Sequence, residues 1–200
     1  MDPILLDFPD SFDTERLTIR EPRPGDGAQI AEAVRESLPE LRPWMPWAQG
    51  EPDAEAQEAR IRKSIADWIA RKDLLLLLFL KGTHTLAGSS GLHRIKWDAR
   101  VFETGYWVRT PFAGQGYITE AVNGITDFAF THLKANRVEI RCDSRNSRSA
   151  AVAKRCGFFL EGVLRHDDLS VGGELRDTLV FSKISAAEFH KYPASGEVHP

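Results

Sequence analysis

The longest uninterrupted apolar run in this chain is only seven residues, from Leu74 to Leu80. A helix that crosses a bilayer needs about 20 apolar residues, so this run is too short to span a membrane. A short apolar run of this kind is typical of a strand that is buried inside a sheet. The chain must therefore build a β-sheet around this segment, and its other patterns have to be placed on that sheet.

The order of the other hydrophobic patterns predicts how the sheet is built. Polar and apolar residues alternate in a strand-like way before the first helix, whereas Ile118 to Leu133 repeats at three and four residues, as an amphipathic helix does. The order predicts an α/β fold with a mixed, mostly antiparallel sheet of about seven strands and about four helices, not a doubly wound sheet. The predicted elements span residues 14–20, 26–37, 53–69, 74–80, 86–95, 101–109, 118–133, 138–142, 146–157, 158–164 and 175–181.

Several helix ends carry recognisable residues. Asp26, Asp53 and Asn146 are placed to cap three helices, and Gly157 is placed to end the last one. The segment from residue 38 to residue 50 differs, because three prolines are interleaved with Trp44 and Trp47 and forbid a long regular helix. Such a loop is either a lid on the core or part of a pocket wall.

Composition narrows the class of protein. The chain length of 200 residues favours one domain, residues 1–200. Apolar residues make up 42% of the chain and charged residues 28%, and this composition excludes disorder as the main state. The 26 basic and 29 acidic residues give a formal net charge of -3, so neither a nucleic-acid partner nor a membrane partner is predicted.

The number of cysteines limits the kinds of disulfide or metal site that the chain can form. Cys142 and Cys156 are too few for a disulfide framework or a four-cysteine zinc site, and no metal site is predicted. Both lie in apolar segments, which favours buried, reduced thiols. The first residues lack the basic start of a signal peptide, so a soluble, cytoplasmic protein is expected.

The most informative segment joins a strand to a helix through a glycine-containing turn. Tyr106-Trp107-Val108-Arg109-Thr110-Pro111-Phe112-Ala113-Gly114-Gln115-Gly116-Tyr117-Ile118-Thr119-Glu120-Ala121 ends in the start of the amphipathic helix. Backbone N–H groups at such a helix start form an anion site, and Gly114 and Gly116 allow a phosphate to approach closely. No lysine follows Gly116 as a Walker loop requires, and Thr119 stands where a dinucleotide fingerprint needs its third glycine.

This segment resembles the acyl-CoA loop of the GNAT superfamily of N-acetyltransferases. It is most similar to the ribosomal-protein-alanine (RimJ/RimL-like) branch, with its Gly-Tyr-Trp strand, proline and Gly-x-Gly turn. The opening Thr14-Glu15-Arg16-Leu17, the tryptophan loop Leu41-Arg42-Pro43-Trp44-Met45-Pro46-Trp47 and the later Gly157-Phe158 follow in the same order. The resemblance covers residues 13–183 and implies a single acyl-CoA N-acyltransferase domain.

The resemblance implies a sheet that splays at its centre to admit the pantetheine arm of acetyl-CoA. The pyrophosphate would lie on the glycine turn, and Asn146 would contact the pantetheine region in addition to capping its helix. Two residues depart from the family pattern, because Ala113 replaces a Gln or Arg and Ile118 replaces a Gly or Ala. The backbone donors survive both changes, so binding should persist. The implied cofactor-binding residues are Trp107, Val108, Arg109, Gly114, Gln115, Gly116, Tyr117, Ile118, Thr119 and Asn146.

Attack of an amine on a thioester needs a base, an oxyanion donor and a proton for the leaving thiolate. The backbone N–H near Val108 would be the oxyanion donor. The tyrosine acid of many superfamily members is replaced by Ala153, and the resemblance makes Ser149 the candidate acid. Glu103 and Asp168 are the candidate bases. His166 is a third candidate base, and Cys156 is expected to pack rather than react.

The acceptor site is expected to include Trp44, Trp47 and the final hairpin. At pH 7 a lysine needs about 3 kcal/mol more than an α-amine to lose its proton, so a weak base favours a peptide N-terminus or an amino-acid-like amine. Arg42, Arg94 or Arg165 could hold an acceptor carboxylate. A non-catalytic acyl-CoA sensor module and a small domain without a CoA site remain as alternatives. A homodimer is expected from the resemblance, while the acceptor and the acyl-chain preference stay open.

Overall fold

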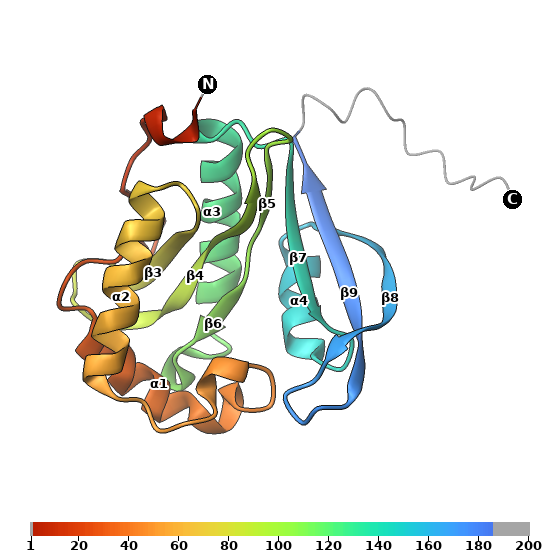
Figure 1. Ribbon diagram of the computed structural model, residues 1–200, viewed down its shortest axis with the longest axis horizontal. Coiled ribbons are helices and arrows are strands. Elements are labelled where there is room, and N and C mark those ends of the chain that lie inside the picture. Colours follow the sequence, from red (N-terminus) through yellow and green to blue (C-terminus); the bar gives the residue numbers. More distant parts are fainter. Residues whose placement is uncertain (1, 186–200) are drawn as a thin grey trace, which may run out of the picture.

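The computed structural model describes residues 2–185 (Figure 1). Four α-helices and nine strands alternate along the chain, with three short 3-10 helices at Pro3–Leu5, Pro46–Ala48 and Thr110–Phe112. The α-helices are α1 (Gly27–Leu41), α2 (Ala54–Ile69), α3 (Tyr117–His132) and α4 (Ser147–Arg155). The strands are β1 (Ser11–Asp13), β2 (Leu17–Arg20), β3 (Leu74–Leu80), β4 (Leu86–Lys96), β5 (Val101–Glu103), β6 (Tyr106–Val108), β7 (Arg137–Asp143), β8 (Phe159–Leu169) and β9 (Leu175–Ile184).

All nine strands belong to one sheet in the order β1-β2-β3-β4-β5-β7-β9-β8, with β6 also paired to β4. Every pairing is antiparallel except that of β5 with β7. The mixed, mostly antiparallel α/β sheet with four helices is therefore confirmed. The strand count rises from about seven to nine because β1 adds a strand, and because the predicted strand 101–109 divides at Thr104 and Gly105.

The division between β5 and β6 produces the splay. β5 pairs in parallel with β7 as far as Glu103 and Glu139, and the N–H of Thr104 adds one more bond to the carbonyl of Glu139. Beyond this point β6 pairs with β4 alone among the described strands. Figure 1 shows β5 and β7 together at one end and diverging toward the other. The predicted central splay is confirmed.

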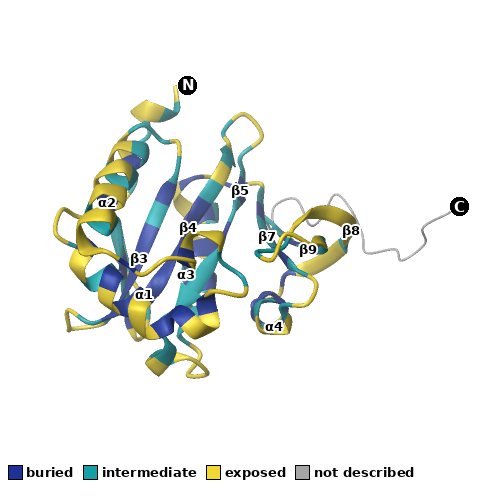
Figure 2. Cartoon of the chain, turned by 60° about the horizontal axis from the view of Figure 1, so that its bottom comes forward, coloured by how far each residue is buried: buried dark blue, intermediate teal, exposed yellow. Residues whose placement is uncertain are grey.

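The helices cover both faces of the sheet. α1 and α2 pack together on one face over β3 and β4, while α3 lies on the other face over β2, β4 and β6, with α4 beside it against β7. The largest buried cluster lies beneath α3 and α4, and it includes Ile125, Phe102 and Phe181. Figure 2 shows the buried interior of β3 and β4 and the exposed edge strand β8. No helix within residues 2–185 is long and apolar enough to cross a membrane.

The two helices of the first face differ from prediction at their ends. Asp26 stands at the predicted N-cap of α1, but its carboxylate binds Arg20 instead of capping the helix. Glu58 of α2 caps the start of α1 in its place, because its carboxylate accepts hydrogen bonds from the N–H groups of Gly25 and Gly27 at 3.0–3.2 Å. The predicted capping by Asp26 is therefore wrong, since a neighbouring helix supplies the carboxylate.

The C-terminal end of α1 also lies beyond its predicted position. The prediction placed this end at residue 37, before Pro39, but α1 continues to Leu41. The N–H of Arg42 still bonds to the carbonyl of Leu38, so the proline is accommodated within the last turn. The predicted caps Asp53 and Asn146 and the terminating Gly157, with its positive φ of 73°, are confirmed.

Candidate active site

The turn between β6 and α3 is an open cradle of backbone donors. Gly114 and Gly116 have φ angles of 75° and 84°, in the left-handed region that glycine adopts without strain. Within residues 2–185, the six N–H groups from Gly114 to Thr119 have no hydrogen-bond acceptor, and no atom lies within 4 Å of a Cβ built on Gly114. The positive end of a 16-residue helix lies behind these donors. The turn therefore fits the diphosphate of an acyl-CoA.

Two arginines border this cradle, and the sequence did not single them out for it. A guanidinium N–H of Arg16 donates to the carbonyl of Gln115 at 2.9 Å, and the group lies 4.4 Å from the ring centre of Tyr117. Arg155 of α4 donates to the hydroxyl of Thr119 at 3.3 Å. Arg16 is ion-paired with Glu120 of α3 at 2.6 Å, so of the two arginines it is Arg155 that adds to the attraction for an anion. Arg16 belongs to the Thr14–Leu17 motif, but only the folded chain places that motif beside the turn.

The two departures from the family pattern leave the cradle intact. Ile118 is half-buried and packs against the large core cluster, so its bulk is directed away from solvent. The N–H of Ala113 donates to the carbonyl of Thr110, which closes the preceding 3-10 turn. The missing Gln or Arg side chain at Ala113 therefore removes a polar group without opening the turn.

Arg109 anchors β6 to α1 and does not face the cradle. Its guanidinium binds Glu36 and Glu32 at 2.6–2.8 Å, and the hydrogen bond from Glu36 raises the pKa of Arg109 above its ordinary value. Its backbone N–H donates to the carbonyl of Ala87 on β4, and its carbonyl accepts from Phe112. Within residues 2–185 Arg109 therefore has no unpaired backbone donor to offer a cofactor.

Ser149 and Tyr106 connect β6 to α4 across the splay. The hydroxyl of Tyr106 donates to the carbonyl of Ser149 at 2.9 Å, and the hydroxyl of Ser149 lies 3.2 Å from that of Tyr106. Asn146 holds the start of α4 by accepting from the N–H of Ser149 at 3.0 Å. Burial raises the pKa of Tyr106, so its phenol stays protonated. The sequence motif contained Tyr106 but gave no sign that it would meet Ser149.

The thiols are packed as the sequence indicated. Burial raises the pKa of Cys156 to about 11, so the neutral thiol dominates at pH 7. Its sulfur contacts the carbonyl of Thr119 at 3.5 Å. Burial also raises the pKa of Cys142, and both cysteines are unpaired. Neither thiol has the lowered pKa of a reactive nucleophile.

The two candidate carboxylate bases differ in environment. Burial raises the pKa of Glu103, whose side chain is 19% exposed and lies 3.4 Å from Arg94. The N–H of Leu169 and the charge of Arg176, at 2.8 Å, lower the pKa of Asp168, whose side chain is 58% exposed. The structure therefore makes Glu103 the stronger base of the two.

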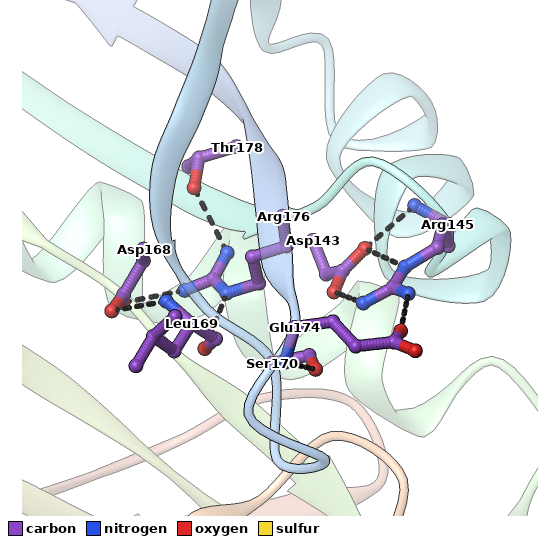
Figure 3. A network of polar contacts seen from close by, with 8 residues as sticks. All are labelled: Asp143, Arg145, Asp168, Leu169, Ser170, Glu174, Arg176 and Thr178. Carbon is purple, nitrogen blue, oxygen red and sulfur yellow. Dashed lines mark hydrogen bonds and ion pairs between the residues drawn. The ribbon is translucent and has the colours of Figure 1, made fainter.

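Figure 3 shows the polar network that holds the final hairpin and includes Asp168. Arg176 binds Asp168 and the hydroxyl of Thr178, while Arg145 binds Asp143 at 2.8 Å and Glu174 at 3.6 Å. These contacts link β8 and β9 to the segment before α4. His166, the third candidate base, is exposed and its backbone N–H donates to Asp177.

A cavity of about 360 Å³ lies on the opposite side of β6, under α1 and α2. Its apolar wall includes Met45, Trp47 and Trp107, and the rings of the two tryptophans are 6.0 Å apart. Trp44 is half-buried and does not line it. The tryptophan loop therefore contributes Trp47 to a pocket wall, which is one of the two roles predicted for this loop.

The cavity also contains a polar pair that the sequence analysis missed. Nδ1 of His93 lies 2.8 Å from a carboxylate oxygen of Asp73, and both residues line the cavity. The two residues are 20 positions apart and carry no shared motif. Only the pairing of β3 with β4 brings them together, so no local pattern could have indicated the pair.

Comparisons with known proteins agree with this geometry. The family model described as an acetyltransferase (GNAT) domain matches residues 16–159. YdaF of Bacillus subtilis (strain 168), provisionally named a ribosomal N-acetyltransferase, is 33% identical over 172 residues, 84% of this chain and 91% of the relative. The ribosomal-protein-serine acetyltransferase of Escherichia coli (strain K12) is 30% identical over 101 residues, 46% of this chain and 56% of the relative.

A solved structure extends the comparison to a bound cofactor. The microcin C7 self-immunity acetyltransferase MccE, in complex with acetyl-CoA and AMP, has a TM-score of 0.81 and 25% identity, over 89% of this chain and 98% of that chain. Together with the splayed sheet and the open glycine turn, these matches define an acyltransferase. The chain belongs to the GNAT acetyltransferase family, and it is an N-acetyltransferase that takes its acetyl group from acetyl-CoA. The relatives named for ribosomal proteins confirm the resemblance to that branch.

Proposed function

We propose that this enzyme acetylates the α-amine of a peptide N-terminus or of an amino-acid-like small molecule, by direct attack on acetyl-CoA in a ternary complex. The observation that carries the proposal is the position of β6, which leads into the cradle at one end and lines the cavity with Tyr106 and Trp107. A cofactor in the splay and an acceptor in the cavity would meet at this strand. The names of YdaF and of the serine acetyltransferase support a protein acceptor.

The cofactor-binding roles follow the order of the chain. The backbone of Val108 would hold the pantetheine arm, with Asn146 beside it on α4, and the diphosphate would lie on the N–H groups of residues 114–119. The backbone of Trp107 faces β4, so Trp107 would act through its ring, which lines the cavity. The N–H of Arg109 is directed to β4, and neighbouring N–H groups of a strand alternate in direction. The N–H of Val108 would therefore point into the splay and stabilise the oxyanion. Arg109 itself would act by fixing β6 to α1.

Ser149 is the proposed acid. The nitrogen–carbon bond forms, the carbon–sulfur bond breaks, and the hydroxyl of Ser149 gives its proton to the departing thiolate and regains one from solvent. Its contacts with Tyr106 and Asn146 hold it at the splay. Glu103 and Asp168 are the proposed proton acceptors on the amine side, and the raised pKa of Glu103 favours it over Asp168.

Replacing Ser149 by alanine is expected to lower kcat about 10- to 100-fold, because the thiolate loses its positioned proton donor. Ser149→Thr keeps a hydroxyl and should retain most of the activity. Steady-state release of CoA thiol measures both variants, and calorimetry checks that each still binds acetyl-CoA. Unchanged turnover in Ser149→Ala would remove this residue as the acid.

The acceptor class is tested with two matched peptides. One has a free N-terminus and no lysine, and the other has an acetylated N-terminus and one lysine. We expect kcat/KM at pH 7 to be about 100-fold higher for the first, because an α-amine loses its proton about 3 kcal/mol more readily than a lysine. Preference for lysine would contradict the proposal. Acetyl-CoA binding without thiol release to any amine would instead support the sensor module.

The oligomeric state and the location belong to the same proposal. We infer a homodimer through the edge strand β8, because large apolar side chains are exposed there and on the final hairpin. Analytical sedimentation should therefore give twice the chain mass of 22.4 kDa. The unpaired thiols and the use of acetyl-CoA favour the cytoplasm, which cell fractionation would test. The exposed apolar residues of β8 and its hairpin are Phe159, Leu160, Val163, Leu164, Leu169 and Leu175.

A further inference from the structure

The aspartate and histidine in the cavity have the geometry of a proton-accepting dyad. Nδ1 of His93 is 2.8 Å from Oδ2 of Asp73. Asp73 directly precedes β3 and His93 lies on β4, next to the antiparallel pair Leu74 and Leu92. A carboxylate on one ring nitrogen fixes the ring orientation and leaves Nε2 as the nitrogen that can exchange a proton.

Two glycines make space for this ring. A Cβ built on Gly91 would lie 2.7 Å from Cε1 and 2.9 Å from Nε2 of His93, and one built on Gly105 would lie 3.9 Å from its Cδ2. The ring therefore lies against the backbone between these two glycines, and it lines the cavity together with Trp107 of β6. The dyad thus shares one cavity with the strand that would hold the thioester.

We propose that His93 is a catalytic residue that takes the proton from the ammonium group of the acceptor, and that Asp73 is its positioning residue. This inference rests on the proposed function. A nitrogen–hydrogen bond of the ammonium breaks, the proton moves to Nε2, and the freed lone pair forms the new bond to the acetyl carbon. The carbon–sulfur bond then breaks, Ser149 protonates the departing thiolate, and the nitrogen releases its second proton to solvent. The imidazolium then returns its proton to Glu103, which is paired with His93 across the strands, or to solvent.

The charges around the ring suit this step. The titratable groups that face it are Asp73 before β3, Glu103 on β5, Arg60 on α2 and Tyr106 on β6. Asp73 is the carboxylate in direct contact with the ring, Glu103 is itself paired with Arg94 at 3.4 Å, and the neutral phenol adds no charge. The carboxylate of Asp73 also attracts an ammonium ion into the cavity.

The test compares His93→Gln with wild type over a range of pH. At pH 7 we expect kcat/KM to fall about 10-fold, because only about a tenth of an α-amine is neutral at that pH, with the acetyl-CoA dissociation constant unchanged. Above about pH 9 the loss should shrink below about 2-fold, because an α-amine is then deprotonated without help. Asp73→Asn should move the acid limb of the kcat/KM profile, a change that a merely structural residue would not cause. His84→Gln, on the exposed turn before β4, is the matched control and should behave as wild type.

A second readout does not depend on turnover. The imidazole NMR resonance that His93→Gln removes should shift when a peptide with a free N-terminus is added without acetyl-CoA. Loss of activity by the same factor at every pH, or no loss at all, would overturn the role of His93. Wild-type enzyme that acetylates no amine would overturn the proposed function, whereas active wild type with an equally active His93→Gln would overturn only the dyad.

Discussion

Replacing Gly114 by aspartate is expected to weaken acetyl-CoA binding about 1,000-fold. Gly114 has a φ of 75° and open space where its Cβ would be, so the new carboxylate would point into the cradle where the diphosphate should lie. Like charges brought together in a binding site cost several kcal/mol, and each 1.4 kcal/mol is a factor of ten in the dissociation constant. Calorimetric titration with acetyl-CoA measures the effect.

Two variants separate charge from backbone strain. Gly114→Asn has nearly the same shape without the charge, and both Asn and Asp adopt the left-handed region more readily than other residues. Gly82→Asp places the same carboxylate at a φ of 73°, also in open space, but on the turn between β3 and β4. We expect a much smaller loss for Gly114→Asn and none for Gly82→Asp. Equal affinities for all three variants would show that the diphosphate lies elsewhere.

The cradle illustrates what the sequence could predict. Gly114, Gly116 and the helix pattern that follows are contiguous, so the local sequence alone predicts a turn and an anion site. The central splay was predictable only from the family resemblance, because the division at Thr104 and Gly105 carries no hydrophobic pattern of its own.

The local sequence could not predict the features that depend on tertiary packing. Asp26 and Glu58 are equally plausible caps by residue type, and only the contact of α1 with α2 decides that Glu58 accepts from Gly27. Asp73 and His93 meet because β3 and β4 pair in one particular register. A one-residue change of that register would turn one of them to the other face of the sheet, and no property of either residue fixes it.

The close approach of β6 to β4 gives a second large effect. A Cβ on Gly88 would lie 2.3 Å from the carbonyl oxygen of Trp107 and 3.1 Å from the Cα of Val108. These are backbone atoms that cannot rotate away, so Gly88→Ala must push β6 off β4. Overpacking of this kind lowers the free energy of unfolding by about 1–3 kcal/mol. Denaturant unfolding measures that change.

The same displacement should reduce kcat/KM for acetyl transfer about 1,000-fold. It moves the N–H of Val108 away from the oxyanion, and loss of one such donor alone costs about 100- to 1,000-fold in kcat. It also displaces Trp107, whose ring lines the acceptor cavity. We expect kcat to fall more than KM rises, because the donor acts on the transition state.

Gly162→Ala is the matched control for Gly88→Ala. Gly162 lies in strand β8, it lacks a positive φ, and no atom lies within 4 Å of its added Cβ. Alanine there should change the free energy of unfolding by less than about 0.5 kcal/mol and leave turnover unchanged. A stable, fully active Gly88→Ala would mean that β6 can retreat without consequence, and the assignment of the oxyanion donor to this strand would then be wrong.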